Sequence, residues 1–279
     1  MKEISTTLNI GVEKPFSFIH LSDTHIILAD RRNDQRKIEL AEKRAAYPVF
    51  KEAKAVLEKA AQISKQRNIT IVHTGDLIDF VSYANLDAAK EFVQKTDCLF
   101  TAGNHEFSLY LGEAVEDEEY RNKSLDLVQK HFNNDIRFYS KIINGVNFVG
   151  IDDSYYRIDK EQLKKLKAET EKDYPIILYM HSPLYAEELY NYHRELHPEI
   201  PFTYLLNVPE NKMDFYPPAI FKEQKADETT EEAYDLIVNC DKIKAVLAGH
   251  IHFDYECKVT PDLPQIVTGC STIRTVTVV

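Results

Sequence analysis

The run Phe16-Ser17-Phe18-Ile19-His20-Leu21 leads directly into Ser22-Asp23-Thr24-His25, and this junction sets the pattern for the whole chain. A short apolar run is typical of a buried strand, and the polar cluster after it is typical of a loop at the strand's end. Four more apolar runs end in the same way: 69–73 before Gly75-Asp76, 98–101 before Gly103-Asn104-His105, 176–180 before His181, and 243–247 before Gly249-His250. Because open α/β sheets bind ligands at the carboxyl ends of their strands, we expect the five loops to form one site.

Helical segments separate these strands. Residues 46–66 and 160–172 carry apolar side chains at helical spacing, and the capping-box pattern Thr229-x-x-Glu232 predicts a helix over 233–238. A further strand is expected at 148–151, and a late strand or hairpin at 265–279. Alternating strands and helices indicate an α/β fold, and the absence of a Gly- or Ser-rich linker indicates a single domain over residues 1–279.

Composition limits the classes of function. The chain is 44% hydrophobic and 28% charged, which is ordinary for a globular protein. Its 34 basic and 45 acidic residues give a net charge of −11, which disfavours binding to a nucleic-acid backbone. No apolar run approaches the roughly 18 residues of a membrane span, and the first residues do not resemble a signal peptide. We therefore expect a soluble, cytoplasmic protein without a membrane partner; nothing in the sequence indicates an oligomeric state.

The five loops offer only oxygen and imidazole ligands. Such a set, without thiolate, suits Zn, Mn, Fe or similar divalent ions, and it is large enough for two ions that share one carboxylate. In an extended segment residues i and i+2 point the same way, so Asp23 with His25, and His250 with His252, are expected to face one cavity. The candidates are Asp23, His25, Asp76, Asn104, His105, His181, His250 and His252.

Taken in this order, the loops resemble those of the calcineurin-like metallophosphoesterase superfamily. Single blocks of this kind are common, whereas five in order at strand ends are specific. The blocks extend over about four fifths of the chain and are Asp23-x-His25, Gly75-Asp76, Gly103-Asn104-His105-Glu106, His181 and Gly249-His250-Ile251-His252. The resemblance implies a four-layer α/β/β/α sandwich, in which two mixed sheets are flanked by helices and a dinuclear metal centre lies between the sheets.

The resemblance also implies a role for each candidate residue. One metal would be bound by Asp23, His25 and His252. The other would be bound by Asn104, His181 and His250, and the carboxylate of Asp76 would bridge the two metals. The two divalent ions could be Mn, Fe, Zn or Co, which accept these ligands with similar geometry. A hydroxide between the ions would attack phosphorus in line, because a bound divalent ion lowers the pKa of water to near 7.

His105 has a separate role in the family's pattern. It would not bind metal but would act as a cation and proton donor to the leaving-group oxygen, a contribution of about 10²–10⁴-fold. A histidine at this position, rather than an arginine, favours the phosphodiesterase-like branch. Either Glu106 or Asp79 could orient a histidine through its second ring nitrogen. Asp79 also stands where purple acid phosphatases place a tyrosine ligand, so a metal-bound tyrosinate at that position is excluded.

Two segments follow neither the strand nor the helix rhythm, and we expect them to flank the active site and determine specificity. They are the charged segment 27–44 and the segment 183–218, which is rich in Tyr, Phe and Pro. The aromatic residues of the second segment either cover a sheet edge or stack on a base or sugar. Arg31, Arg32 and Arg194 are the candidate cations for neutralising phosphate oxygens.

The remaining polar residues of note have a structural interpretation. His20, His73 and His193 are among the histidines expected to be structural, although His193 lies in the long insert and could also meet a phosphate. Asp152-Asp153 is expected to cap the helix that follows it rather than to form a catalytic acid pair.

The function expected from these residues is metal-dependent hydrolysis of small phosphodiesters, such as cyclic or bridged nucleotides. The alternative is a phosphomonoesterase acting on nucleotides, sugars or phosphoproteins. Arg or Lys lining the cavity would favour the dianionic monoester, and a neutral aromatic wall would favour the diester. A nuclease is disfavoured by the net charge, and an interaction scaffold that has lost its metals is disfavoured because every ligand position holds the expected residue type.

Overall fold

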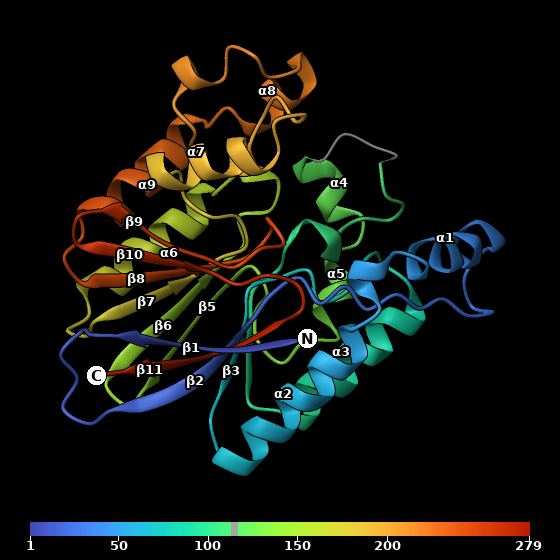
Figure 1. Cartoon of the computed structure of the whole chain (residues 1–279), viewed down its shortest axis with the longest axis horizontal. Helices are drawn as coiled ribbons and strands as arrows, with labels where there is room; N and C mark the ends of the chain where they lie inside the picture. Colours follow the sequence, from blue (N-terminus) through green and yellow to red (C-terminus); the bar gives the residue numbers. More distant parts are fainter. Residues whose placement is uncertain (113–116) are drawn as a thin grey trace.

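The strands form two stacked mixed sheets in the computed structural model, which describes residues 1–112 and 117–279 (Figure 1). The first sheet has the order β1-β11-β2-β3-β4, with bounds Lys2–Leu8, Thr272–Val278, Phe16–Leu21, Ile71–His73 and Cys98–Phe100. The second has the order β5-β6-β7-β8-β10-β9, with bounds Phe138–Ile143, Val146–Ile151, Ile176–Tyr179, Ile243–Ala248, Leu263–Val267 and Tyr255–Thr260.

Helices cover the outer face of each sheet, which completes the four layers. The first sheet is covered by α2 (Ala53–Arg67) and α3 (Tyr83–Lys95), and the second by α6 (Lys160–Glu171) and α9 (Glu228–Asn239). The expected four-layer α/β/β/α sandwich, with two mixed sheets flanked by helices, is confirmed.

Alternation along the strands explains why the sheets stack. In β2, Ile19 and Leu21 pack with the helices on the outer face, while Phe18 packs between the sheets. In β7, Leu178 likewise faces the helices and Tyr179 the space between the sheets. Because successive strand residues point to opposite faces, these two strands fill both the helix-facing cores and the central core.

Shorter elements complete the fold. The helices α4 and α5 span Glu118–Asn122 and Leu125–Gln129, and the 3-10 turns η1 to η4 span Pro48–Phe50, Asn104–Glu106, Ser154–Tyr156 and Glu210–Lys212. None of the helices within the described ranges is both long and apolar enough to cross a membrane.

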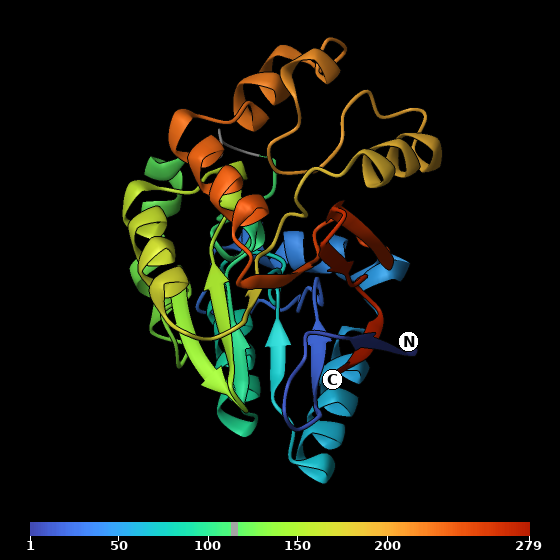
Figure 2. The ribbon, with the colours of Figure 1, turned by 90° about the vertical axis from the view of Figure 1, so that its left-hand side faces the viewer.

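Segments 27–44 and 183–218 both contain helices, so the prediction that they are irregular is wrong. Segment 27–44 carries most of α1 (Gln35–Ala45), and segment 183–218 carries α7 (Glu187–Leu196) and leads into α8 (Pro218–Gln224). We call residues 183–224 the cap. Figure 2 shows the cap above the ends toward which β2 and β3 point, so it stands over the loops that carry the candidate ligands.

Three other boundaries differ from the expectation. The helix expected over 46–66 begins at Ala53 because Pro48 starts a separate 3-10 turn. The helix expected over 233–238 is the longer α9, and its N-cap is Asp227, which accepts the N–H of Thr230. The late strand expected within 265–279 is β11, which begins only at Thr272, and the hairpin alternative is wrong because β10 and β11 lie in different sheets.

Candidate metal centre

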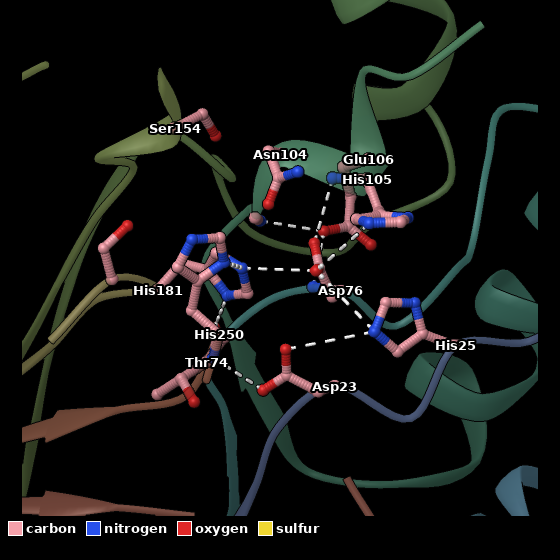
Figure 3. Close-up of polar contacts among 12 residues, drawn as sticks. Asp23, His25, Thr74, Asp76, Asn104, His105, Glu106, Ser154, His181 and His250 are labelled. Carbon is pink, nitrogen blue, oxygen red and sulfur yellow. Dashed lines mark hydrogen bonds and ion pairs between the residues drawn. The ribbon is translucent and has the colours of Figure 1, made fainter. Parts of the chain in front are cut away.

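The eight candidate residues converge at the strand ends, as Figure 3 shows for those around Asp76. Two follow β2, one follows β3, two lie in η2 after β4, one follows β7 and two follow β8. They form three groups, and within each group the ligand atoms lie within 4.8 Å of one another. The groups are Asp23, His25 and His252; His25, Asp76 and His105; and Asp76, His181 and His250. Asp76 therefore belongs to two of the three.

The first end of the cluster is formed by Asp23, His25 and His252. Nε2 of His252 lies 3.5 Å from Oδ1 of Asp23 and 3.2 Å from Nε2 of His25. His25 and Asp23 are buried, while the His252 side chain is 38% exposed, so this end of the cluster opens to solvent.

The second end is formed by His181 and His250, with Asn104 beside them. Nε2 of His181 lies 3.2 Å from Oδ2 of Asp76 and 3.0 Å from Nδ1 of His250. The same Oδ2 of Asp76 lies 3.8 Å from Nε2 of His25 at the first end. The Asp76 carboxylate thus stands between the two ends, where a single carboxylate could contact two ions.

Unpartnered oxygens show that this donor set fits metal ions. Oδ1 of Asp23 and Oδ1 of Asn104 are both buried without a hydrogen-bond partner. A buried polar atom without a partner costs free energy, and a cation held by these oxygens and the adjacent imidazoles would remove that cost. The set of carboxylate, amide and imidazole groups could hold two divalent ions of the Mn, Fe, Zn or Co type.

The backbone at these residues is strained. Asp23, His25, Asp76, His250 and His252 all have φ between +48° and +69°, in the left-handed region that side chains rarely adopt. The segments Asp23–His25 and His250–His252 are therefore not extended. The side chains of each pair do face the same cluster, as predicted, but the predicted cause, an extended backbone, is wrong. Strained backbone of this kind concentrates at functional sites.

Glycines allow the loops to approach one another. A Cβ at Gly103 would lie 2.3 Å from Oδ1 of Asp76, and a Cβ at Gly249 would lie 1.7 Å from Oγ of Ser22. Both distances are shorter than any tolerable contact, so neither position accepts a side chain without moving the candidate ligands.

Asp79, one of the two residues left open as a histidine partner, orients His25. Nδ1 of His25 donates to Oδ1 of Asp79 at 3.0 Å, which turns Nε2 toward the cluster. The Arg44 guanidinium donates to both oxygens of the same carboxylate at 2.6 and 2.7 Å. Burial raises the pKa of Asp79, but the hydrogen bonds from Arg44 and His25 outweigh it and hold that pKa well below its usual range.

Glu106 has a different task, because it holds backbone rather than a histidine ring. Its fully buried carboxylate accepts the N–H groups of four residues at 2.8–3.1 Å: Gly103, Asp76, Leu77 and Ile78. Burial and the charge of Asp76 raise the pKa of Glu106, and the backbone donors oppose that rise. Glu106 thus ties the loop that carries Asp76 to the loop that carries Asn104 and His105.

Asp153 fixes His181, which corrects the expectation that Asp152-Asp153 caps a helix. The buried Asp153 carboxylate accepts the N–H groups of His181 and Ser182 at 2.7 and 2.9 Å, and burial raises its pKa to about 6. Asp152 instead binds Arg137, and the cap of α6 is Asp159.

His105 stands beside the cluster with one ring nitrogen engaged. Its Nδ1 donates to the backbone carbonyl of Asp79 at 2.7 Å, which leaves Nε2 on the side of Asp76, 3.9 Å from Oδ2. Burial lowers the pKa of His105, but the carboxylates of Asp76 and Asp79 outweigh it and raise that pKa above its ordinary value.

Two of the three arginines singled out from the sequence, Arg32 and Arg194, have other contacts. Arg32 pairs with Asp30 and Asp87, and Arg194 donates to the carbonyl of Ile200. The cation that contacts Asp79 is instead Arg44, which no sequence motif predicted.

Tyr156 is a second residue that sequence reasoning missed. Its hydroxyl lies 2.8 Å from Nε2 of His250, 94 residues away in sequence, and so engages the ring nitrogen opposite the one that faces His181. The only indication of Tyr156 in the sequence is its position after strand β6, because the candidate ligands also follow the ends of strands.

Three of the histidines expected to be structural lie outside the cluster. The buried His20 is hydrogen-bonded to Thr74 and Thr268, and His73 to Thr24. His193 is buried in the cap against the rings of Tyr204 and Phe253 and is not one of the cluster's groups.

The cap's aromatic residues mainly cover the sheet. Tyr185, Tyr190 and Tyr216 pack with Ala248 and other residues of the second sheet. Tyr204 differs, since its ring meets that of His250 at 5.5 Å and lines a small cavity beside it.

Comparison with solved structures finds the same fold. The structure of a dimetal phosphatase from Danio rerio aligns with a TM-score of 0.50 and 15% identity over 91% of this chain and 87% of that one. Phosphopantetheinyl hydrolase from Mycobacterium tuberculosis aligns with a TM-score of 0.47 and 10% identity over 91% of this chain and 90% of that one. No curated protein sequence matches significantly. The calcineurin-like phosphoesterase family model matches residues 16–254, and the chain therefore belongs to this family.

Proposed function

We propose that the chain is a two-metal phosphodiesterase acting on small phosphodiesters. The observation that carries this proposal is the convergence of two histidine-containing groups on Asp76, with buried unpartnered oxygens on Asp23 and Asn104. When bound, two divalent ions supply Lewis acidity and lower the pKa of water toward 7.

Each of the chain's ligand residues has a place in this proposal. Three residues at each end would hold one ion and a central carboxylate would contact both: Asp23, His25 and His252; Asn104, His181 and His250; and Asp76. Asp79 and Asp153 would keep the two ends oriented through their bonds to His25 and to the His181 backbone.

His105 would act as the general acid. Nδ1 of His105 keeps its proton and donates it in a hydrogen bond to the backbone carbonyl of Asp79. A further proton on Nε2 makes the ring an imidazolium, the form favoured by Asp76 and Asp79. That Nε2 proton would pass to the leaving-group oxygen as its bond to phosphorus breaks.

The cavity beside the cluster favours a diester over a monoester. It has a volume of about 100 Å³, and no Lys or Arg stands among the described residues that line it. Tyr155, Tyr156 and Tyr204 contribute to its wall, and its one carboxylate is Glu223. A monoester dianion would meet a carboxylate there without a compensating cation, whereas a diester carries one charge fewer.

Matched chromogenic substrates test the proposal. Initial rates on bis-p-nitrophenyl phosphate and p-nitrophenyl phosphate, in Mn²⁺ and in chelator, should show metal-dependent turnover that favours the diester. Asp76→Asn should abolish it, while Asp241→Asn at the exposed surface should not. Preference for the monoester would select the phosphomonoesterase alternative, and no turnover of either ester by metal-loaded protein would contradict both.

A further inference from the structure

The small cavity adjoins only one end of the cluster. Three of its lining residues are the candidate ligands Asn104, His181 and His250, whereas His105 and His25 are not among the residues that line it. Figure 3 shows the same division, with His181, His250 and Ser154 on one side of Asp76 and His25 and His105 on the other. A phosphodiester whose leaving group faces His105 would thus direct its other ester group toward this cavity.

Glu223 brings a carboxylate without a direct partner to the cavity. It comes from α8 of the cap and is half-buried, and within residues 1–112 and 117–279 its carboxylate has no hydrogen bond or ion pair. Arg157 influences Glu223 electrostatically, but its guanidinium donates to the carbonyls of Tyr156 and Lys222. Burial raises the pKa of Glu223, which reflects the same lack of a partner.

Ser154 adds a second unpartnered group to the lining of the cavity. The residue is 1% exposed, and its Oγ has no hydrogen-bond partner. Its backbone is fixed, because its N–H donates to Oδ1 of Asp152 at 2.9 Å. Glu223 and Ser154 therefore bring one acceptor and one hydroxyl to the lining of the cavity, and within the described residues neither group has a hydrogen-bond partner.

The volume of the cavity limits what can enter it. About 100 Å³ corresponds to roughly three water molecules at ~30 Å³ each. A two-carbon chain that ends in one polar atom fills this space beside the cluster, and a longer group would continue into the wider pocket of about 830 Å³ that Ser154, Tyr155 and Glu223 also line.

We propose that this cavity receives the ester group that stays on phosphorus, and that Glu223 and Ser154 select a short alcohol bearing a second hydrogen-bond donor, either a hydroxyl or an ammonium. The inference rests on the proposed phosphodiesterase function and names the substrate class for it. An alkyl group of the same length would leave the Glu223 carboxylate and the Ser154 hydroxyl unpaired, and sites built to bind a donor discriminate strongly against analogues that lack it.

Three p-nitrophenyl phosphodiesters of equal length test the proposal, with 2-aminoethyl, 2-hydroxyethyl or propyl as the retained group. Rates would be measured with the Mn²⁺-loaded protein after subtraction of the rate in Mn²⁺ alone. The better of the two donor-bearing esters should exceed the propyl ester in kcat/KM by about 10–100-fold, the range of one hydrogen bond to a charged group. Preference for 2-aminoethyl identifies amino-alcohol esters, and preference for 2-hydroxyethyl identifies polyol esters.

Variants separate the cavity from the metal centre. Glu223→Gln should reduce the preference for the donor-bearing ester, most strongly for 2-aminoethyl, while turnover of the propyl ester is retained. Glu195→Gln, on the exposed face of α7, is the matched control and should change neither.

Three results would overturn the inference, and they are distinguishable. Equal kcat/KM for the three esters would refute the selection while leaving the phosphodiesterase function intact. A preference that survives both Glu223→Gln and Ser154→Ala would assign it to other residues. Absence of turnover of all three esters, with normal metal content, would refute the proposed function and the selection together.

Discussion

Glu106→Gln is the isosteric change that the structure predicts to be severe. The carboxylate accepts two N–H groups on each oxygen: those of Leu77 and Ile78 on Oε1, and those of Gly103 and Asp76 on Oε2. A glutamine can offer its oxygen to only one of these pairs, and in either orientation its NH₂ group faces two backbone donors. Two hydrogen bonds to a charged acceptor are lost, each worth about 1.5–3 kcal/mol, so the expected destabilisation is about 3–6 kcal/mol.

The assay is equilibrium unfolding of metal-free protein in denaturant at pH 9, where Glu106 is ionised although its pKa is raised to about 8, together with a thermal melt. A loss of this size is a large fraction of a typical total stability of about 5–15 kcal/mol, and for a chain of 279 residues it should lower Tm by about 5–10 °C. Glu171→Gln, at an exposed position of α6, is the matched control and should change stability by less than about 0.5 kcal/mol. A Glu106→Gln protein within about 1 kcal/mol of the wild type would refute the reasoning, since it would mean that the four donors do not depend on the negative charge.

Three further changes separate metal binding from proton transfer. Asp76→Asn should remove most bound metal, measured by elemental analysis, because this carboxylate stands between both ends; retention of two ions would contradict that. His105→Ala should keep metal content, since its backbone N–H still donates to Asp76, and should slow turnover by about 10²–10⁴-fold, more for poor leaving groups; loss of both ions would show that His105 is a ligand. Asp79→Asn should weaken metal affinity by about 10–100-fold in a chelator titration, because it loosens the His25 ring; unchanged affinity would mean that the ring is held by packing alone.

The core strands and the place of the candidate site could be predicted from the sequence because both depend on local pattern, whereas the four layers of the fold were implied only by the resemblance to the family. The five apolar runs that end in polar residues identify core strands and their carboxyl ends at once. The strand β1 was missed because Lys2–Leu8 is mostly polar and lies at a sheet edge, where burial leaves little apolar signature. The helix α7 was missed because its segment is rich in Tyr and charged residues, and the whole of 183–218 was expected to be irregular.

The residues that support the candidate ligands could not be predicted, because their contacts join distant parts of the chain. Asp153 meets the His181 backbone 28 residues away, and Tyr156 meets His250 across 94 residues. No spacing rule connects such pairs, since each depends on how the sheets stack and on which loop lies over which strand end. Asp152-Asp153 illustrates the difficulty: a helix cap explains the two acids locally, and only the tertiary structure shows that Asp153 holds the backbone of another loop.

The left-handed backbone at five candidate ligands explains why these supporting contacts are needed. A left-handed residue with a side chain costs about 1–2 kcal/mol, and glycine, which would remove the cost, has no ligand atom. Asp and His must therefore occupy positions that their own backbone disfavours, and the surrounding structure must hold them there. Glu106 does so for the loop at Asp76 through backbone N–H groups, whereas Asp153 fixes the backbone of His181, which is not left-handed. Both acids act on main chain rather than on ligand atoms, so the strain at Asp76 is opposed even without metal, and the ions would bind to loops that are already in place.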